Sequence, residues 1–159
     1  MKKNLPFEKL RRNDLYQVFV FSCPVNFPYS FARHPWVVLN KKGVLSRWEI
    51  FWQKDRAAPS WGHLHKDFYP PTQGTRITRF AKKTPFWPSR VDTYIEGEEG
   101  SLAEKIVSFI ESSPEKYPYC YKYSLFGPNS VTYAQYMLKQ FSKSGLRLPW
   151  NSFSWLFAR

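Results

Sequence analysis

Three side chains in this sequence have types and positions that suit nucleophilic catalysis: Ser130, His34 and Glu49. Hydrolases of this kind place a nucleophile at the start of a helix, an imidazole base on a neighbouring strand and a third polar group that orients the ring. Ser130 follows Asn129 and opens a segment with helical spacing, so we expect its hydroxyl on the helix face that packs on a sheet. The chemistry this predicts is hydrolysis or acyl transfer at an amide or ester.

A β-hairpin is predicted to bring His34 and Glu49 together. Residues 34–39 and 44–53 flank the segment Asn40-Lys41-Lys42-Gly43, whose residue types favour a tight turn. If the first and last of these four residues pair, Glu49 lies directly opposite His34 on one face of the sheet. The carboxylate would then fix the imidazole tautomer, and free amides at the helix start would stabilise an oxyanion. A slip of one residue would move Glu49 to the other face.

The other elements predict an α+β fold, a small antiparallel sheet with two packed helices. Residues 15–22 are rich in Val, Phe and Tyr, which is typical of a buried strand, and we expect short strands around residues 76–80 and 91–95. A capping box at Ser101-Leu102-Ala103-Glu104 predicts a helix that Pro114 ends. A second helix is expected from near residues 127–130 to about residue 143.

The size of the chain predicts one domain over residues 1–159. We expect its core at about residues 15–145, with the aromatic segment 146–159 docked on that core. The segment 54–98 holds five prolines and has no clear periodicity, so apart from the two short strands expected in it its structure is not predicted.

The motifs resemble those of a known superfamily. His34 on a strand before a hairpin and Asn129-Ser130-Val131-Thr132-Tyr133 at a helix start look like the circularly permuted branch of the papain-like NlpC superfamily, which includes lecithin:retinol acyltransferase-like proteins. There the second signature resembles Asn-Cys-x-x-Phe, so Ser130 stands in the place of the nucleophilic cysteine. Over about residues 15–145, Tyr117-Pro118-Tyr119 and Gly127-Pro128-Asn129-Ser130, with His34-Pro35-Trp36 upstream, further resemble an uncharacterised bacterial family without an assigned activity.

The resemblance implies a permuted papain-like fold with a catalytic set of Ser130, His34 and Glu49, and with Asn129 and Trp36 beside it for binding. A serine hydroxyl must lose its proton to a base during attack, whereas a cysteine is easily held as the thiolate. The site is therefore either an active serine site or a decayed cysteine site, and both alternatives stay open.

Each of these residues also has a structural interpretation. Asn129 and Ser130 are ordinary helix-capping residues, a role worth about 1 kcal/mol. His34 can end a loop with its ring bonded to the backbone, and Glu49 can be solvated or paired with Arg47 or Arg33.

The net charge points to a second class of function. The chain has 24 lysines and arginines against 12 aspartates and glutamates, a formal net charge of +12. This balance favours acidic partners. The competing hypothesis is a non-catalytic binding module whose basic surface recognises nucleic acid, anionic lipid or an acidic protein.

The composition narrows the class of protein further. Apolar residues make up 43% of the chain, enough for a packed core, yet no run reaches the roughly 18 apolar residues of a membrane-spanning helix. Cys23 and Cys120 are too few for a disulfide framework or a four-ligand zinc site, and no cofactor is required. His63 and His65 with Asp67 lack a further ligand for a metal, so we interpret them as surface histidines. The expected location is the cytoplasm.

Overall fold

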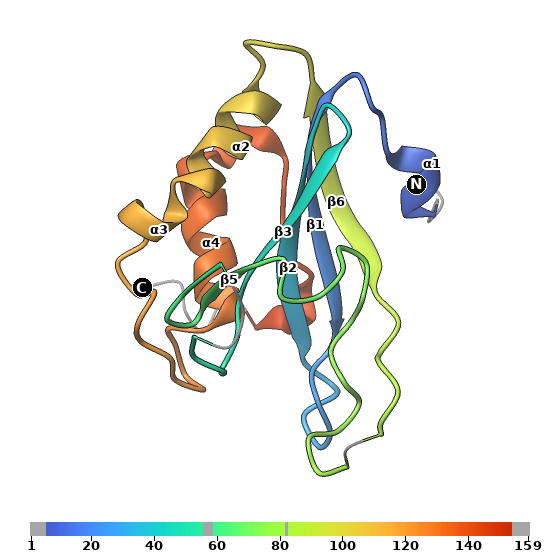
Figure 1. The fold of residues 1–159 in the computed structure, drawn as a ribbon, viewed down its shortest axis with the longest axis vertical. Coiled ribbons are helices and arrows are strands. Elements are labelled where there is room, and N and C mark those ends of the chain that lie inside the picture. Colours follow the sequence, from blue (N-terminus) through green and yellow to red (C-terminus); the bar gives the residue numbers. More distant parts are fainter. Residues whose placement is uncertain (1–5, 56–58, 82, 154–159) are drawn as a thin grey trace.

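One antiparallel sheet of six strands forms the body of the computed structural model, which describes residues 6–55, 59–81 and 83–153 (Figure 1). The strand order is β4-β5-β3-β2-β1-β6, so β1, β2, β3 and β5 are interior strands. Their bounds are β1 Tyr16–Pro24, β2 Arg33–Lys41, β3 Val44–Ile50, β4 Ser60–Trp61, β5 Leu64–Lys66 and β6 Arg90–Gly97. The α+β class predicted from the sequence is confirmed.

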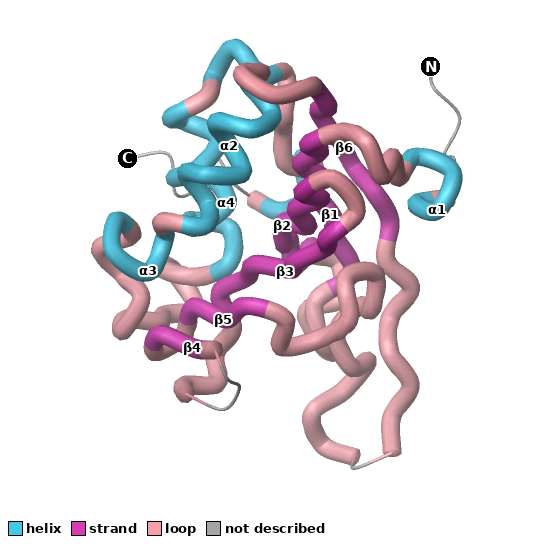
Figure 2. The backbone as a smooth tube through the Cα atoms, turned by 45° about the horizontal axis from the view of Figure 1, so that its top comes forward, coloured by secondary structure: helices cyan, strands magenta, loops and turns pink. Residues whose placement is uncertain are grey.

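Helices lie on both sides of the sheet, and the longer ones share one side (Figures 1 and 2). Helices α2 and α4 pack on this side, which we call the helix face, and α1 lies on the opposite side, the loop face. The bounds are α1 Phe7–Leu10, α2 Leu102–Glu111, α3 Ser113–Lys116 and α4 Ser130–Gln140, followed by 3₁₀ turns η1 Ser142–Ser144 and η2 Trp150–Ser152. The second predicted helix therefore starts where expected and ends about one turn early.

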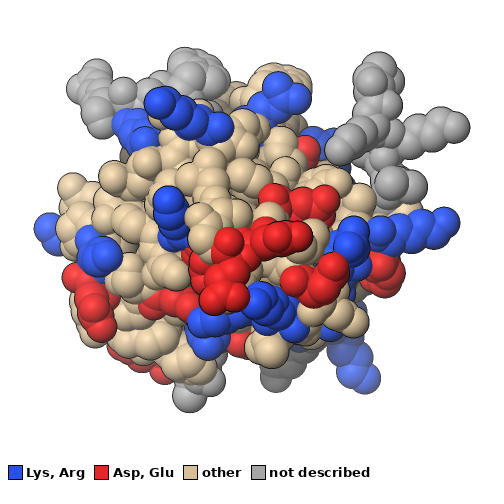
Figure 3. Space-filling view, turned by 90° about the horizontal axis from the view of Figure 1, so that it is seen from above, with Lys and Arg blue, Asp and Glu red and all other residues tan. Residues whose placement is uncertain are grey.

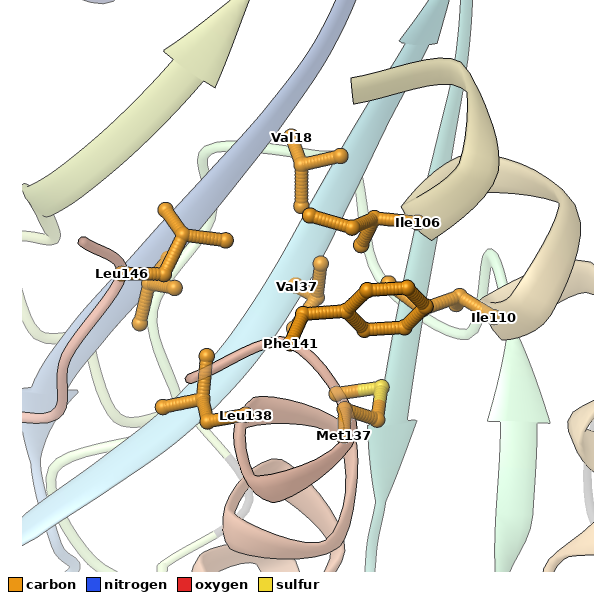
Figure 4. Close-up of a pocket in the computed structure, with 9 residues that line it drawn as sticks. Val18, Val37, Ile106, Ile110, Met137, Leu138, Phe141 and Leu146 are labelled. Carbon is orange, nitrogen blue, oxygen red and sulfur yellow. The ribbon is translucent and has the colours of Figure 1, made fainter. Parts of the chain in front are cut away.

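The main core fills the space between α2, α4 and the helix face. Val18 and Val37 from the strands meet Ile106 of α2 and Met137 of α4, and Figure 4 shows these side chains around a small apolar cavity. The amphipathic spacing of both helices explains this packing, because their apolar residues recur every three or four positions. Apolar burial of this kind is the dominant stabilising term in folding.

A second core lies on the loop face. Phe19, Phe21 and Trp36 are buried there, with the Phe21 and Trp36 rings stacked at 5.6 Å between centroids. Phe7 of α1 closes this core through an edge contact on Phe19 at 5.0 Å. Since successive residues of a strand point to opposite faces, a strand buried on both faces has consecutive apolar residues, as β1 has at 18–21 and β2 at 36–39.

The hairpin forms as predicted but in a different register. Lys41 pairs with Val44, so the turn consists of Lys42 and Gly43, both with positive φ as a type I′ turn requires. Asn40 meets Gly43 through its side chain, whose Oδ1 accepts the Gly43 amide at 2.8 Å. The true register differs from the predicted one by two residues, and a shift of two leaves every side chain on the expected face.

Several other local predictions can now be compared with the structure. The expected strand at 91–95 is β6, whereas residues 76–80 form no strand and make one isolated bridge, Arg76 to Phe86. Ser101 caps α2 by accepting the Glu104 amide at 3.3 Å, while the Glu104 carboxylate accepts from Gly100 instead of Ser101.

The segment after α4 is docked in part. Leu146 and Leu148 pack against the main core, whereas Trp150 is exposed. The rest of the predicted docking segment, residues 154–159, lies outside the described residues.

Candidate functional site

His34 and Glu49 meet on the loop face of the sheet. The Nε2 atom of His34 lies 2.9 Å from Oε2 of Glu49, and the contact runs diagonally between the strands because of the two-residue change in register. Glu49 is fully buried on an interior strand, which excludes the solvated edge position considered for it. A neutral imidazole that donates from Nε2 is held in one tautomer by this bond.

Arg47 completes the buried polar cluster. Its guanidinium donates to Oε2 of Glu49 at 2.9 Å, and its Nε lies 2.8 Å from Oε1 without the alignment of a hydrogen bond. Burial alone would raise the pKa of Glu49, but the charge of Arg47 and the hydrogen bond from His34 outweigh it and lower the pKa to about 2. The carboxylate is therefore ionised at neutral pH and has its charge balanced inside the protein.

The same guanidinium fastens the loop that covers this face. Arg47 donates to the carbonyl of Pro70 at 3.0 Å and to the carbonyl of Gln73, and it lies 4.1 Å from the centre of the Trp36 ring. The backbone amide of Arg47 also donates to Asp67 at 2.7 Å. One arginine thus ties the sheet to the irregular segment 67–73, which is a structural role.

Ser130 lies on the other side of the sheet. It is the first residue of α4, shares the face of Ala134 and Met137 in the main core, and is buried. His34 pairs with Cys23 and belongs to the loop face, so the sheet separates the hydroxyl from the imidazole. Within the described residues the structure gives no contact between Ser130 and His34.

The residues expected to bind beside the site have structural roles. Asn129 is the N-cap of α4: its side chain accepts the amides of Val131 and Thr132 at 3.0 and 3.2 Å. The Asn129 amide in turn donates to the Thr132 hydroxyl, which completes a capping box. Trp36 is buried and donates to the Pro71 carbonyl at 2.9 Å, so neither residue presents a free ligand-binding group.

The residue that sequence reasoning missed on this face is Cys23, the cross-strand partner of His34. The residue types of 15–22 predict the strand that leads into Cys23, but nothing in the sequence shows that Cys23 pairs with His34. Cys23 is fully buried, and burial raises the pKa of its thiol. Since a reactive cysteine is partly exposed and has a lowered pKa, this thiol is inert packing.

The histidines after β4 are used internally, contrary to the expectation of surface positions for both. His65 is buried, accepts from the Ser60 hydroxyl at 2.7 Å and donates to the Gln53 carbonyl at 2.8 Å. His63 lies 3.0 Å from the Phe51 carbonyl through Nδ1. In the described part of the chain, no group of three or more His, Cys, Asp or Glu side chains is placed to hold a metal ion.

The surface feature that stands out is at the end of the sheet where β1 and β3 end and β2 and β6 begin, the lower end of Figure 1. Four loops meet there, residues 25–32, 51–55, 67–89 and 117–129, and we call this region the loop end. It carries exposed aromatic rings from each loop: Phe27, Tyr29, Phe31, Trp52, Phe80, Phe86, Tyr119, Tyr121, Tyr123 and Phe126. Exposed apolar side chains gathered in this way mark interaction sites.

Basic side chains lie among these rings. The guanidinium of Arg79 is 4.8 Å from the centre of the Trp52 ring, and its Nε lies 3.4 Å from Oδ1 of Asn26 in the first loop. Lys54 stands over the Tyr121 ring at 5.8 Å, which connects the second and fourth loops. The loops therefore form one surface in which cations and aromatic faces alternate.

The opposite end of the molecule carries charges of both signs. Residues 51–90 carry eight lysines and arginines against two aspartates, while residues 91–115 carry seven acidic residues against one lysine. Figure 3 views the hairpin end from above and shows acidic side chains gathered over its middle with basic side chains around them. Near the hairpin turn, Lys42 and Lys41 pair with Glu99 and Glu111 at 3.2 and 3.1 Å, and Arg11 donates to the Gly43 carbonyl. The loop end is therefore basic, whereas cations accompany the acidic residues of the hairpin end.

Comparisons with known proteins give a family but no activity. A family model described as "Protein of unknown function (DUF3750)" matches residues 15–154. No curated protein and no solved structure matches the chain. None of the helices among the described residues is long and apolar enough to cross a membrane.

Proposed function

The chain belongs to this family, whose description assigns no activity, and from its surface we propose that it is a non-catalytic module that binds an anionic partner. The observation that carries the proposal is the basic character of the loop end, where cations and exposed rings share one surface, while acidic residues of the hairpin end are paired with lysines. A basic surface of this kind attracts a negative partner before contact.

The buried cluster supports a structural interpretation of His34 and Glu49. Glu49 is fully buried, Arg47 neutralises its charge, and both Arg47 and His34 hydrogen-bond to its Oε2. Hydrolysis through Ser130 would need the hydroxyl within hydrogen-bond reach of the imidazole, roughly 2.6–3.2 Å or somewhat longer in a free enzyme. Since the two groups belong to opposite faces of the sheet, the geometry favours binding over catalysis.

Binding to heparin as a generic polyanion at several salt concentrations tests this proposal. Lys54, Lys83 and Lys122 are exposed at the loop end, and reversing all three to Glu should lower the slope of log affinity against log salt by about 2. The matched control reverses Lys105, Lys139 and Lys143, which are exposed on α2 and beside the C-terminal end of α4. Equal losses from both triple variants would contradict the proposal.

Labelling with a fluorophosphonate provides the second arm of this experiment. We expect the fluorophosphonate to label neither the wild type nor Ser130→Ala at this residue, because Ser130 is buried at a helix start away from the imidazole. The two proteins should also bind heparin equally. Labelling of the wild type that Ser130→Ala abolishes and His34→Ala weakens would overturn the binding proposal in favour of a serine hydrolase.

A further inference from the structure

The loop end has the chemistry of a surface that docks on a lipid bilayer. We propose that the anionic partner is a membrane surface rich in acidic phospholipids, with the aromatic loop tips entering the headgroup region; this inference rests on the proposed function. It names the partner class of the same surface and assigns separate roles to its rings and its cations.

The aromatic side chains at the loop tips are mostly exposed to solvent. Phe80 is 88% exposed, Phe126 84%, Phe31 65% and Phe27 62%, and Leu125 beside Phe126 adds an exposed aliphatic side chain. Water contact with so many large apolar groups at one end is unfavourable, and insertion into the boundary between headgroups and acyl chains relieves it.

Hydrogen bonds join two of the loops that carry the rings and the cations. The amide of Phe27 donates to the Ile77 carbonyl at 2.8 Å, and the Asn26 side chain donates to the carbonyl of Arg76. These bonds fix the loop that carries Phe27 to the segment that carries Arg79 and Phe80. Insertion of the rings would therefore bring Arg76, Arg79 and Lys83, all exposed, to the level of the lipid phosphates.

The loop tips fit a bilayer better than a nucleic acid. Stacking on a base needs a ring whose face is held in a fixed plane by its neighbours. A ring as exposed as Phe80 or Phe126 has little packing to hold its plane, whereas entry into a fluid interface needs only that the ring project outward. Charge complementarity with acidic headgroups supplies the long-range attraction, and the rings supply short-range apolar burial.

Co-sedimentation with vesicles tests the proposal. The full chain is mixed with vesicles of phosphatidylcholine alone or of phosphatidylcholine with phosphatidylserine, and the triple variant Phe27→Ser, Phe80→Ser, Phe126→Ser is compared with wild type. Each removed ring should weaken binding to the acidic vesicles by about tenfold, the equivalent of partial burial of one aromatic side chain. Val44→Ser is the matched control, since Val44 is 70% exposed at the hairpin end and should bind like wild type.

Five outcomes separate this inference from the proposed function and from nucleic-acid binding. Loss of vesicle binding in the ring variant, with heparin binding retained, supports the membrane surface. Vesicle binding by the ring variant equal to wild type overturns it. Heparin binding without vesicle binding by wild type overturns the inference and leaves the proposed function standing, whereas failure to bind either ligand overturns both. Tighter binding of a single-stranded oligonucleotide than of acidic vesicles, lost in the ring variant, would assign the surface to nucleic acid.

Discussion

At the scale of single residues, the buried cluster of His34, Glu49 and Arg47 stabilises the folded protein. A buried carboxylate is costly unless its charge is balanced and it is hydrogen-bonded, and here a guanidinium and an imidazole both bond to Oε2 while the guanidinium balances the charge and lies against Oε1. Glu49 and Arg47 are fully buried and His34 nearly so. The group of residues that first suggests catalysis therefore has a sufficient explanation in stability.

Replacing Glu49 by Gln leaves the charge of Arg47 buried without its partner. We expect the free energy of unfolding to fall by about 3–5 kcal/mol in urea denaturation, against a change within about 0.5 kcal/mol for the exposed control Glu115→Gln. The pKa of Glu49 is about 2 in the folded protein and has an ordinary value of 4.5, so its contribution is complete above pH 4.5 and is lost as the pH falls toward 2.

The wild type should therefore lose stability over that pH window more steeply than Glu49→Gln does. If Glu49→Gln lowers the free energy of unfolding by less than about 1 kcal/mol, or if the wild type and the variant lose stability equally with falling pH, the role given to the ion pair is contradicted.

The contact of His34 with Glu49 is the part of the site that sequence reasoning predicts. It survives an error of two residues in the hairpin register because side chains on a strand repeat every two positions. The position of Ser130 relative to His34 is not predictable in the same way. β2 is buried on both faces and its middle, residues 35–39, is continuously apolar, so its sequence has no alternation that shows which face meets the helices.

At the scale of elements, the covering segment 67–89 is attached to the sheet by several strand residues. Arg47 donates to the carbonyls of Pro70 and Gln73, Trp36 donates to the carbonyl of Pro71, and Cys23 accepts the amide of Thr75. Because these bonds join the segment to distant strands, local propensity says little about it, which explains why the sequence leaves most of it unpredicted. The caps are local interactions: Ser101 caps α2 as expected although Glu104 does not bond back to it, and of the two candidates Asn129 and Ser130 it is Asn129 that caps α4.

Replacing Arg47 by Lys should loosen the segment even though the charge is kept. A lysine cannot reach Glu49 and both carbonyls at once, which leaves buried acceptors unpaired at about 1–3 kcal/mol. Hydrogen exchange should speed up at the amides of Ile77 and Trp87, which bond across the segment, while the exposed control Arg147→Lys should leave them protected. Unchanged exchange at these two amides in Arg47→Lys would show that other contacts hold the segment.

At the scale of the whole molecule, the composition sets how many cations and aromatic rings there are, and the fold sets where they gather. The sequence gives the excess of cations and the large share of aromatic residues, but its basic residues are scattered along the chain. Antiparallel topology places the connections at alternate ends of the sheet, so loops that are distant in sequence gather at one end. The aromatic and basic loop end is a product of the fold, and so is the mixed charge of the hairpin end.

The most direct test of the central claim is a map of amide chemical shifts in the ¹⁵N-labelled protein during titration with a heparin oligosaccharide. The account predicts shifts concentrated in residues 26–31, 76–80 and 121–127, with little change at the hairpin turn, Lys42 and Gly43, or at residues 98–100. Shifts centred on the hairpin end, or spread evenly over the surface, would contradict a loop end built to meet a negative partner.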